Sequence, residues 1–130
     1  MEKIILPTKT KIAAWWMIIT VAFIIIHGLW MLWNLRDAYV PPSSGFLILV
    51  ILFIHLAGFL VFFPPAFSLR KGKKWAWYWA IIILFLGMAI CTYIYAPELT
   101  TIEYLVVILI LLPPFILLLL DRKNFWKIAS

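Results

Sequence analysis

Four long apolar runs, separated by short polar breaks, make up most of the chain. They cover residues 12–33, 46–63, 75–95 and 102–120. Each run is continuous instead of alternating in polarity, which is typical of membrane-spanning helices and not of barrel strands. Because about 20 apolar residues cross the hydrocarbon core of a bilayer, the pattern predicts an all-α, four-helix transmembrane bundle. Residues 1–130 would form a single integral membrane domain.

The breaks between the runs predict where the helices end. Residues 34–45 combine charged residues with prolines, serines and a glycine, which is typical of a turn. The pair Pro64-Pro65 predicts the end of the second helix, and residues 96–98 predict the end of the third. Asp121, followed by Arg122 and Lys123, predicts the end of the fourth. The tail at 124–128 predicts a short amphipathic turn along the membrane surface.

Positive charge predicts the orientation of these helices. Of the 11 Lys and Arg residues, all but Arg36 would lie on one side of a four-span protein. Lys and Arg are retained on the cytoplasmic side, so the chain is expected to be a multi-pass protein of the cell membrane with both termini in the cytoplasm. The first run is expected to be an uncleaved signal anchor. The residues on the basic side are Lys3, Lys9, Lys11, Arg70, Lys71, Lys73, Lys74, Arg122, Lys123 and Lys127.

Composition supports the membrane assignment and removes other classes. The chain is 67% hydrophobic and 12% charged, with a mean hydropathy of +1.12. A water-soluble fold would lack the polar residues to cover this much apolar surface. The net charge of +6 is explained by orientation, so the lipid bilayer and not a nucleic acid is the expected partner. Cys91 is the single cysteine, which excludes a disulfide within the chain.

The two halves of the chain resemble each other. Each starts with a lysine and a tryptophan-rich segment, and each contains a double proline followed by a basic pair. This similarity predicts a parallel internal repeat of two helices plus two. The alternative is that tryptophan and lysine recur at membrane boundaries without common ancestry. Pro113 and Pro114 fall inside the fourth run, where they predict a hinge, although membrane helices also tolerate proline without a functional role.

His27 and His55 are the candidate chemistry within the spans. Polar side chains at such depth usually face the interior of a bundle. Three interpretations are open: a haem b held between two imidazoles, a polar pocket for a quinone or lipid, and two neutral histidines bonded to each other, to Thr20 or to a backbone carbonyl. Gly28 and Gly58 lie near these histidines in the sequence and favour close helix contact there, and Gly87 is expected to do the same in the third run.

No span contains a deeply placed Asp, Glu, Lys or Arg, and no HExxH motif, phosphate loop or Ser/His/Asp set is present. Proton exchange through a buried carboxylate, as in small multidrug exporters, therefore fits poorly. We expect no catalysis and no metal site. The leading hypothesis is an accessory or self-associating membrane subunit. The alternatives are a redox-associated subunit that binds haem b or quinone, and a small carrier or channel.

The loop Ser68-Leu-Arg-Lys-Gly-Lys-Lys-Trp-Ala-Trp resembles the connection between the second and third helices of small prokaryotic four-helix membrane proteins, including DoxX-like proteins. The resemblance covers about ten residues of a kind that membrane topology itself favours. It implies a prokaryotic four-helix bundle, and it transfers no active-site residue.

Overall fold

The computed structural model describes residues 5–37, 45–90, 92–93 and 101–130, and in these ranges the chain is helical throughout its regular structure. Five helices follow one another: α1 (Thr8–Asp37), α2 (Gly45–Arg70), α3 (Lys74–Ile90), α4 (Thr101–Leu120) and α5 (Arg122–Ile128). The prediction of an all-helical protein is therefore confirmed. Three of the helices, α1, α2 and α4, are long and apolar enough to cross a membrane.

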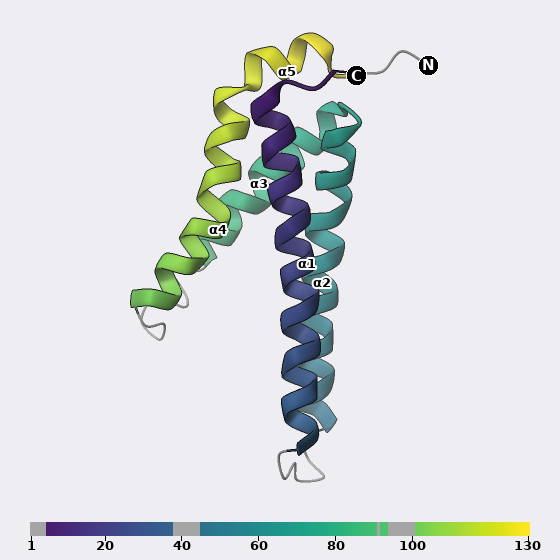
Figure 1. Ribbon diagram of the computed structural model, residues 1–130, viewed down its shortest axis with the longest axis vertical. Coiled ribbons are helices and arrows are strands. Elements are labelled where there is room, and N and C mark those ends of the chain that lie inside the picture. The colour runs from purple at the N-terminus through teal and green to yellow at the C-terminus, as the bar shows by residue number, and fades with distance from the viewer. Residues whose placement is uncertain (1–4, 38–44, 91, 94–100) are drawn as a thin grey trace.

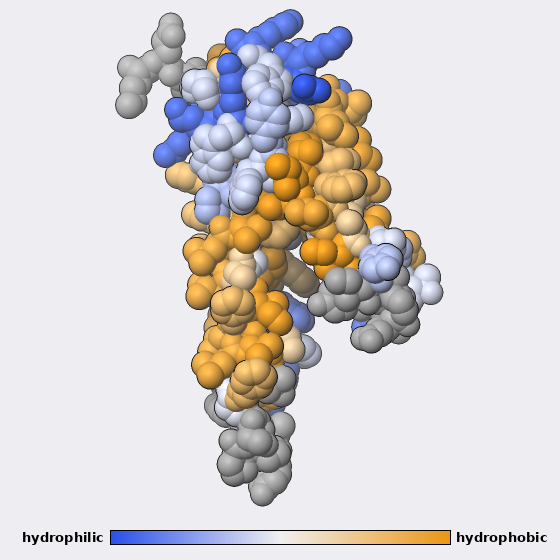
Figure 2. All heavy atoms as spheres, turned by 180° about the vertical axis from the view of Figure 1, so that it is seen from behind, coloured by the Kyte–Doolittle hydropathy of each residue, from blue (hydrophilic) through white to orange (hydrophobic). Residues whose placement is uncertain are grey.

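The helices form two pairs that meet at one end and diverge at the other. Helices α1 and α2 lie side by side along the long axis, while α3 and α4 lean away from them, and α5 crosses the end where the pairs meet (Figure 1). Each pair also contacts the other, through α1 with α4 and α2 with α3. The end marked by α5 carries the described Lys and Arg residues other than Arg36, and an apolar surface follows below it (Figure 2).

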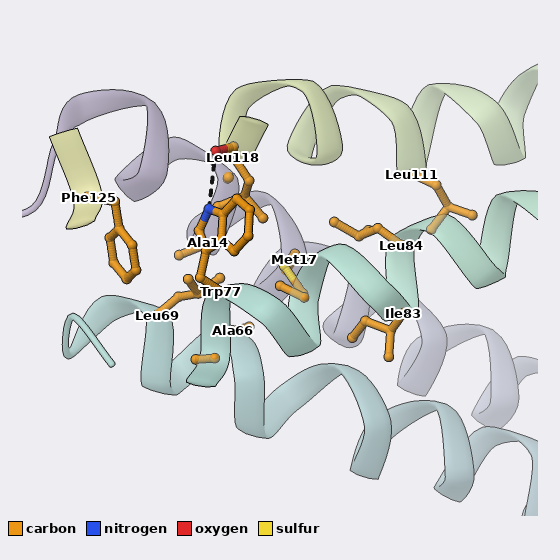
Figure 3. Packing of buried hydrophobic residues seen from close by; sticks show 13 residues of the cluster. Ala14, Met17, Ala66, Leu69, Trp77, Ile83, Leu84, Leu111, Leu118 and Phe125 are labelled. Atoms are coloured by element: carbon orange, nitrogen blue, oxygen red, sulfur yellow. Dashed lines mark hydrogen bonds between the residues drawn. The ribbon is translucent and has the colours of Figure 1, made fainter. Parts of the chain in front are cut away.

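Because the pairs diverge, the common core occupies the basic end. Small residues of α1, α2 and α3 allow the helix backbones to approach closely there. Larger side chains such as Met17, Trp77 and Leu118 fill the space between them (Figure 3). The core reaches Val21 on α1 and the partly buried Phe62 on α2. Beyond it, residues 24–35 of α1 and 45–59 of α2 continue as a two-helix extension, which we call the arm. The small residues of the core are Ala13, Ala14, Ala66, Ala76 and Ala80.

The predicted end of the second helix at Pro64-Pro65 is wrong. Both prolines lie inside α2, which continues to Arg70. A proline disturbs the turn before it and does not prevent the helix from continuing after it. The helix ends instead at Arg70, shortly before Gly72, whose φ of 68° is a left-handed conformation that suits glycine. The Gly72 and Lys73 amides donate to the Leu69 and Ser68 carbonyls at 2.9 and 3.1 Å, the pattern of a Schellman cap.

The two double prolines occupy equivalent positions, because each lies inside a helix and near its C-terminal end. Pro64 and Pro65 lie six and five residues before the end of α2, and Pro113 and Pro114 lie seven and six residues before the end of α4. Pro65 and Pro114, the second of each pair, are both fully buried. The sequence suggested that the pairs differed, one ending a helix and the other lying within one. In the structure both lie within helices.

The structure describes only part of the third predicted span, residues 75–95. Helix α3 begins at Lys74, as expected, and its described part of 17 residues ends at Ile90. It is apolar but shorter than the other candidate spans. Cys91 and the predicted continuation over residues 94–95 lie outside the described residues, as do the turn residues 38–44 and 96–98. In the tail, where a short turn was predicted, residues 122–128 form the short helix α5.

Candidate functional site

The arm brings the two histidines into direct contact. His27 on α1 and His55 on α2 lie with Nδ1 of the former 3.3 Å from Nε2 of the latter. Their rings are nearly parallel, at 25°, with centroids 5.6 Å apart. Nδ1 of His55 lies 2.7 Å from the carbonyl oxygen of Ile51, one turn earlier in α2. His27 is exposed and His55 is half-buried. Thr20, which the sequence offered as a partner, donates instead to the Trp16 carbonyl at 3.0 Å.

Gly28 creates the space that the histidine pair needs. It is buried against the His55 ring, and a Cβ at this position would lie 2.7 Å from His55 Cδ2. Any larger residue would therefore displace the His55 ring or push α1 and α2 apart at the histidines. Gly58 faces Ile24 across the same helix contact, but there a Cβ would meet the nearest carbon at an ordinary 3.6 Å. Gly87 lies between α3 and α4, and a Cβ added there would lie 3.3 Å from Cδ1 of Leu111.

Two hollows flank the histidine pair. The smaller, of about 250 Å³, has both histidines in its wall, whereas the larger, of about 320 Å³, has only His55. The rest of each wall is almost entirely apolar, so the histidine rings provide the polar groups available to a ligand. Phe23, Ile24, Ile54 and Gly58 complete the smaller hollow. Ile25, Gly28, Leu29, Leu32, Ile51, Leu52, Leu56 and Phe59 complete the larger.

The arrangement does not fit a haem between the two rings. An iron held by two opposite imidazoles separates the ligating nitrogens by about 4 Å, given metal–nitrogen bonds of about 2 Å. It also places the macrocycle between the rings. Here the facing nitrogens of His27 and His55 are 3.3 Å apart. Gly28 lies directly against the His55 ring. A haem would thus require α1 and α2 to separate. Over the described ranges, no three His, Cys, Asp or Glu side chains are grouped closely enough to hold a metal ion.

The double proline of α4 has a specific partner. In a regular helix the amide of residue 114 would donate to the carbonyl of Ile110, but Pro114 has no amide hydrogen. The indole Nε1 of Trp16 on α1 donates to that carbonyl instead, at 3.0 Å. Pro113 and Pro114 both lie inside α4, which continues to Leu120. The freed carbonyl is therefore satisfied by the neighbouring helix, and it ties α1 to α4 near the prolines.

Sequence reasoning missed a buried carboxylate at the basic end. Asp121, which was identified only as a helix end, is 3% exposed. Its Oδ2 accepts hydrogen bonds from the amide and the hydroxyl of Thr10, at 2.8 and 2.9 Å. Thr10 lies in the first turn of α1, where amides have no partner within the helix, so Asp121 caps a helix distant in sequence. An acidic residue placed directly between an apolar helix and a basic segment was the available signal, but its partner was not predictable.

The last residues of the chain close the same end. The amide of Ser130 donates to the Gly72 carbonyl at 2.9 Å, and the amide of Lys74 donates to the Ser130 carbonyl at 3.0 Å. The segment after α5 is therefore paired with the loop between α2 and α3. This contact, together with the Asp121–Thr10 contact, joins α1, α2, α3 and α4 at the end where they share a core.

No family model, curated protein or solved structure matches this chain. Its function therefore has to be inferred from the geometry of the arm, the core and the basic end.

Proposed function

We propose that the chain is a prokaryotic four-span bundle of the cell membrane with both termini in the cytoplasm. The gathering of the described Lys and Arg residues other than Arg36 at the α5 end supports this orientation (Figure 2). The fourth crossing would be α3, extended past Ile90. A reporter fused after Ser130 should be active only in the cytoplasm, and one inserted at Ser43 only outside. The opposite pattern would overturn the topology. The equivalent positions of the two double prolines, each with its second proline buried, also support the internal repeat.

Within the membrane, the proposed role is that of a non-enzymatic accessory or self-associating subunit. The observation that carries it is the arm, which projects beyond the shared core. Its helices pack against each other and present apolar side chains outward, among them Leu29, Phe53 and Leu56, which are 62%, 72% and 57% exposed. Helix association in lipid is favoured by close packing and by polar contacts between helices. An extended helix pair with uncovered sides gives another helix a long surface for such packing.

A second copy of the chain is the first partner to test, by cysteine crosslinking in native membranes. In a Cys91→Ser background, Phe53→Cys places one thiol on the arm, and Phe85→Cys places one on an exposed site of α3, away from the arm. We expect a crosslinked dimer from Phe53→Cys and not from Phe85→Cys. Mild solubilisation followed by mass measurement then tests for other partners. A monomer that crosslinks at neither site and co-purifies with no membrane complex would refute the proposed role.

A second candidate function, a subunit that binds a quinone-like ligand, is favoured by the histidine pair. His27 and His55 place polar groups in an otherwise apolar wall, between two hollows. Intramembrane ionisable residues are rare and commonly mark ligand or ion sites. Quinone binding fits the arrangement better than haem b does, because it requires no separation of α1 from α2. Titration of the purified protein with a short-chain quinone tests this candidate, and the absence of any binding to the quinone or its reduced form would remove it.

A further inference from the structure

Nε2 of His27 is a polar atom on the largely apolar surface of the arm. His27 is exposed on the arm, and at 1.5 Å per residue it lies about 9 Å along α1 from Trp33, the predicted outer boundary. In a bilayer this position is within hydrocarbon. Its Nδ1 is used by His55, but over the described residues its Nε2 has no hydrogen-bond partner. A polar group without a partner in hydrocarbon is costly, so a partner from outside the chain would be stabilising.

The hydrogen-bond chain determines what this atom can do. We treat both rings as neutral, because a charged side chain at this depth is costly. The Ile51 carbonyl can only accept, so His55 Nδ1, at 2.7 Å, must carry the hydrogen. His55 Nε2 then has a lone pair, and it accepts from His27 Nδ1 at 3.3 Å. This leaves His27 Nε2 as a lone pair too, able to accept a hydrogen bond and unable to donate one.

From this chain of tautomers we propose that His27 Nε2 is an acceptor site for the hydroxyl group of an amphiphile with an apolar body, with an isoprenoid quinol as the favoured form. The proposal rests on the second candidate function above. An oxidised quinone presents only carbonyl oxygens, which cannot donate to a lone pair. The site would therefore select the reduced form of such a ligand against the oxidised form.

The surroundings of His27 suit a ring better than a bare chain. Phe23 stacks near His27, with centroids 6.2 Å apart and planes at 21°, and Trp30 lies 6.0 Å away on the same helix. Aromatic rings prefer such neighbours. The same atom of a second copy of the chain is not a partner for it, because two His27 Nε2 lone pairs repel each other. The smaller hollow, walled by both histidines, provides space next to the pair.

The first test examines the tautomers in the unaltered protein. Nitrogen-15 NMR of histidine-labelled protein in nanodiscs of phosphatidylethanolamine and phosphatidylglycerol distinguishes protonated from unprotonated ring nitrogens. We expect both rings to be protonated at Nδ1 and unprotonated at Nε2, with a coupling between His27 Nδ1 and His55 Nε2. A hydrogen on His27 Nε2 would overturn the proposal, whatever the protein binds.

The second test measures binding through the His27 Nε2 resonance. Decylbenzoquinol, its oxidised quinone and farnesol are titrated separately into the nanodiscs without oxygen. One hydrogen bond of ordinary strength corresponds to about a tenfold change in affinity, so we expect the quinol to bind at least about tenfold more tightly than the quinone. If farnesol binds as tightly as the quinol, the site accepts hydroxyl lipids in general. If only the quinol binds, the site accepts aromatic hydroxyl groups. Both outcomes support the acceptor role of His27 Nε2.

Variants separate this inference from the function on which it rests. His27→Phe keeps a ring and removes the acceptor, and should lower quinol affinity about tenfold, to that of the quinone. His27→Gln can donate and accept, and should bind both forms. Phe85→Leu, on α3, is the control and should match the unaltered protein. Equal binding of quinol and quinone to the unaltered protein would refute the acceptor role alone. No binding of any of the three compounds would refute both the role and the quinone-binding candidate.

Discussion

Replacing Asp121 by alanine should loosen the whole basic end of the molecule. Oδ2 of Asp121 accepts two hydrogen bonds from Thr10, from the amide at 2.8 Å and from the hydroxyl at 2.9 Å. Thr10 itself is 0% exposed. The substitution therefore leaves an amide and a hydroxyl buried without this acceptor, in the first turn of a helix whose amides have no other partner in the helix.

The size of the effect follows from these two bonds. A hydrogen bond to a charged group contributes about 1.5–3 kcal/mol, and a buried donor left without a partner costs a similar amount. Two bonds to one oxygen are not additive, so we expect Asp121→Ala to lower the free energy of unfolding by about 3–5 kcal/mol. Thr10→Val removes the hydroxyl and keeps the amide, and should cost about 1–2 kcal/mol. The double variant should cost less than the sum of the two single variants.

The free energy of unfolding is measured in mixed micelles by raising the mole fraction of dodecyl sulfate and monitoring unfolding through tryptophan fluorescence. Hydrogen exchange at the Thr10 amide gives a local readout, which should accelerate in Asp121→Ala. Asn124→Ala is a matched control, because its side chain donates only to the other oxygen, Oδ1, at 3.2 Å. The reasoning would be refuted if Asp121→Ala unfolded at the same point as the unaltered protein, or if the two single effects added without coupling.

Three further predictions test the contacts described above. Trp16→Phe removes the donor to the Ile110 carbonyl and should lower the free energy of unfolding by about 1 kcal/mol. In a Pro114→Ala background, which supplies a backbone amide to that carbonyl, Trp16→Phe should cost much less. An equal loss in both backgrounds would contradict the role of Trp16 as the replacement donor. Gly28→Ala, which would place a Cβ 2.7 Å from a His55 ring held by two hydrogen bonds, should cost about 1–3 kcal/mol. Gly58→Ala, with 3.6 Å available, should be nearly neutral in the same micelle titration, and similar effects at both sites would count against the close approach. Gly72→Ala forces a side chain into a left-handed conformation and should cost about 1–2 kcal/mol, measured by thermal unfolding; an unchanged midpoint would argue against the cap.

The helical class and most of the helix positions could be predicted from the sequence alone. Bilayer solvent requires long continuous apolar segments, and such segments are visible without knowing what they contact. The predicted runs at 12–33 and 102–120 accordingly lie within α1 and match α4 closely. The end of α2 was missed because a double proline was taken as a stop, whereas the stop is the left-handed Gly72.

Which side chains meet could not be predicted from the sequence, because it depends on how the helices pack. The sequence offered several partners for His27 and His55, and the contact between them depends on the rotation of two helices about their axes, which uniformly apolar segments leave open. The same holds for Asp121 and Thr10, whose contact joins positions 111 residues apart, and for Trp16 with the carbonyl that Pro114 frees. Apolar length places a helix across a membrane, but hydrogen bonds and close packing between helices set its rotation and depth against its neighbours, and these depend on residues distant in the chain.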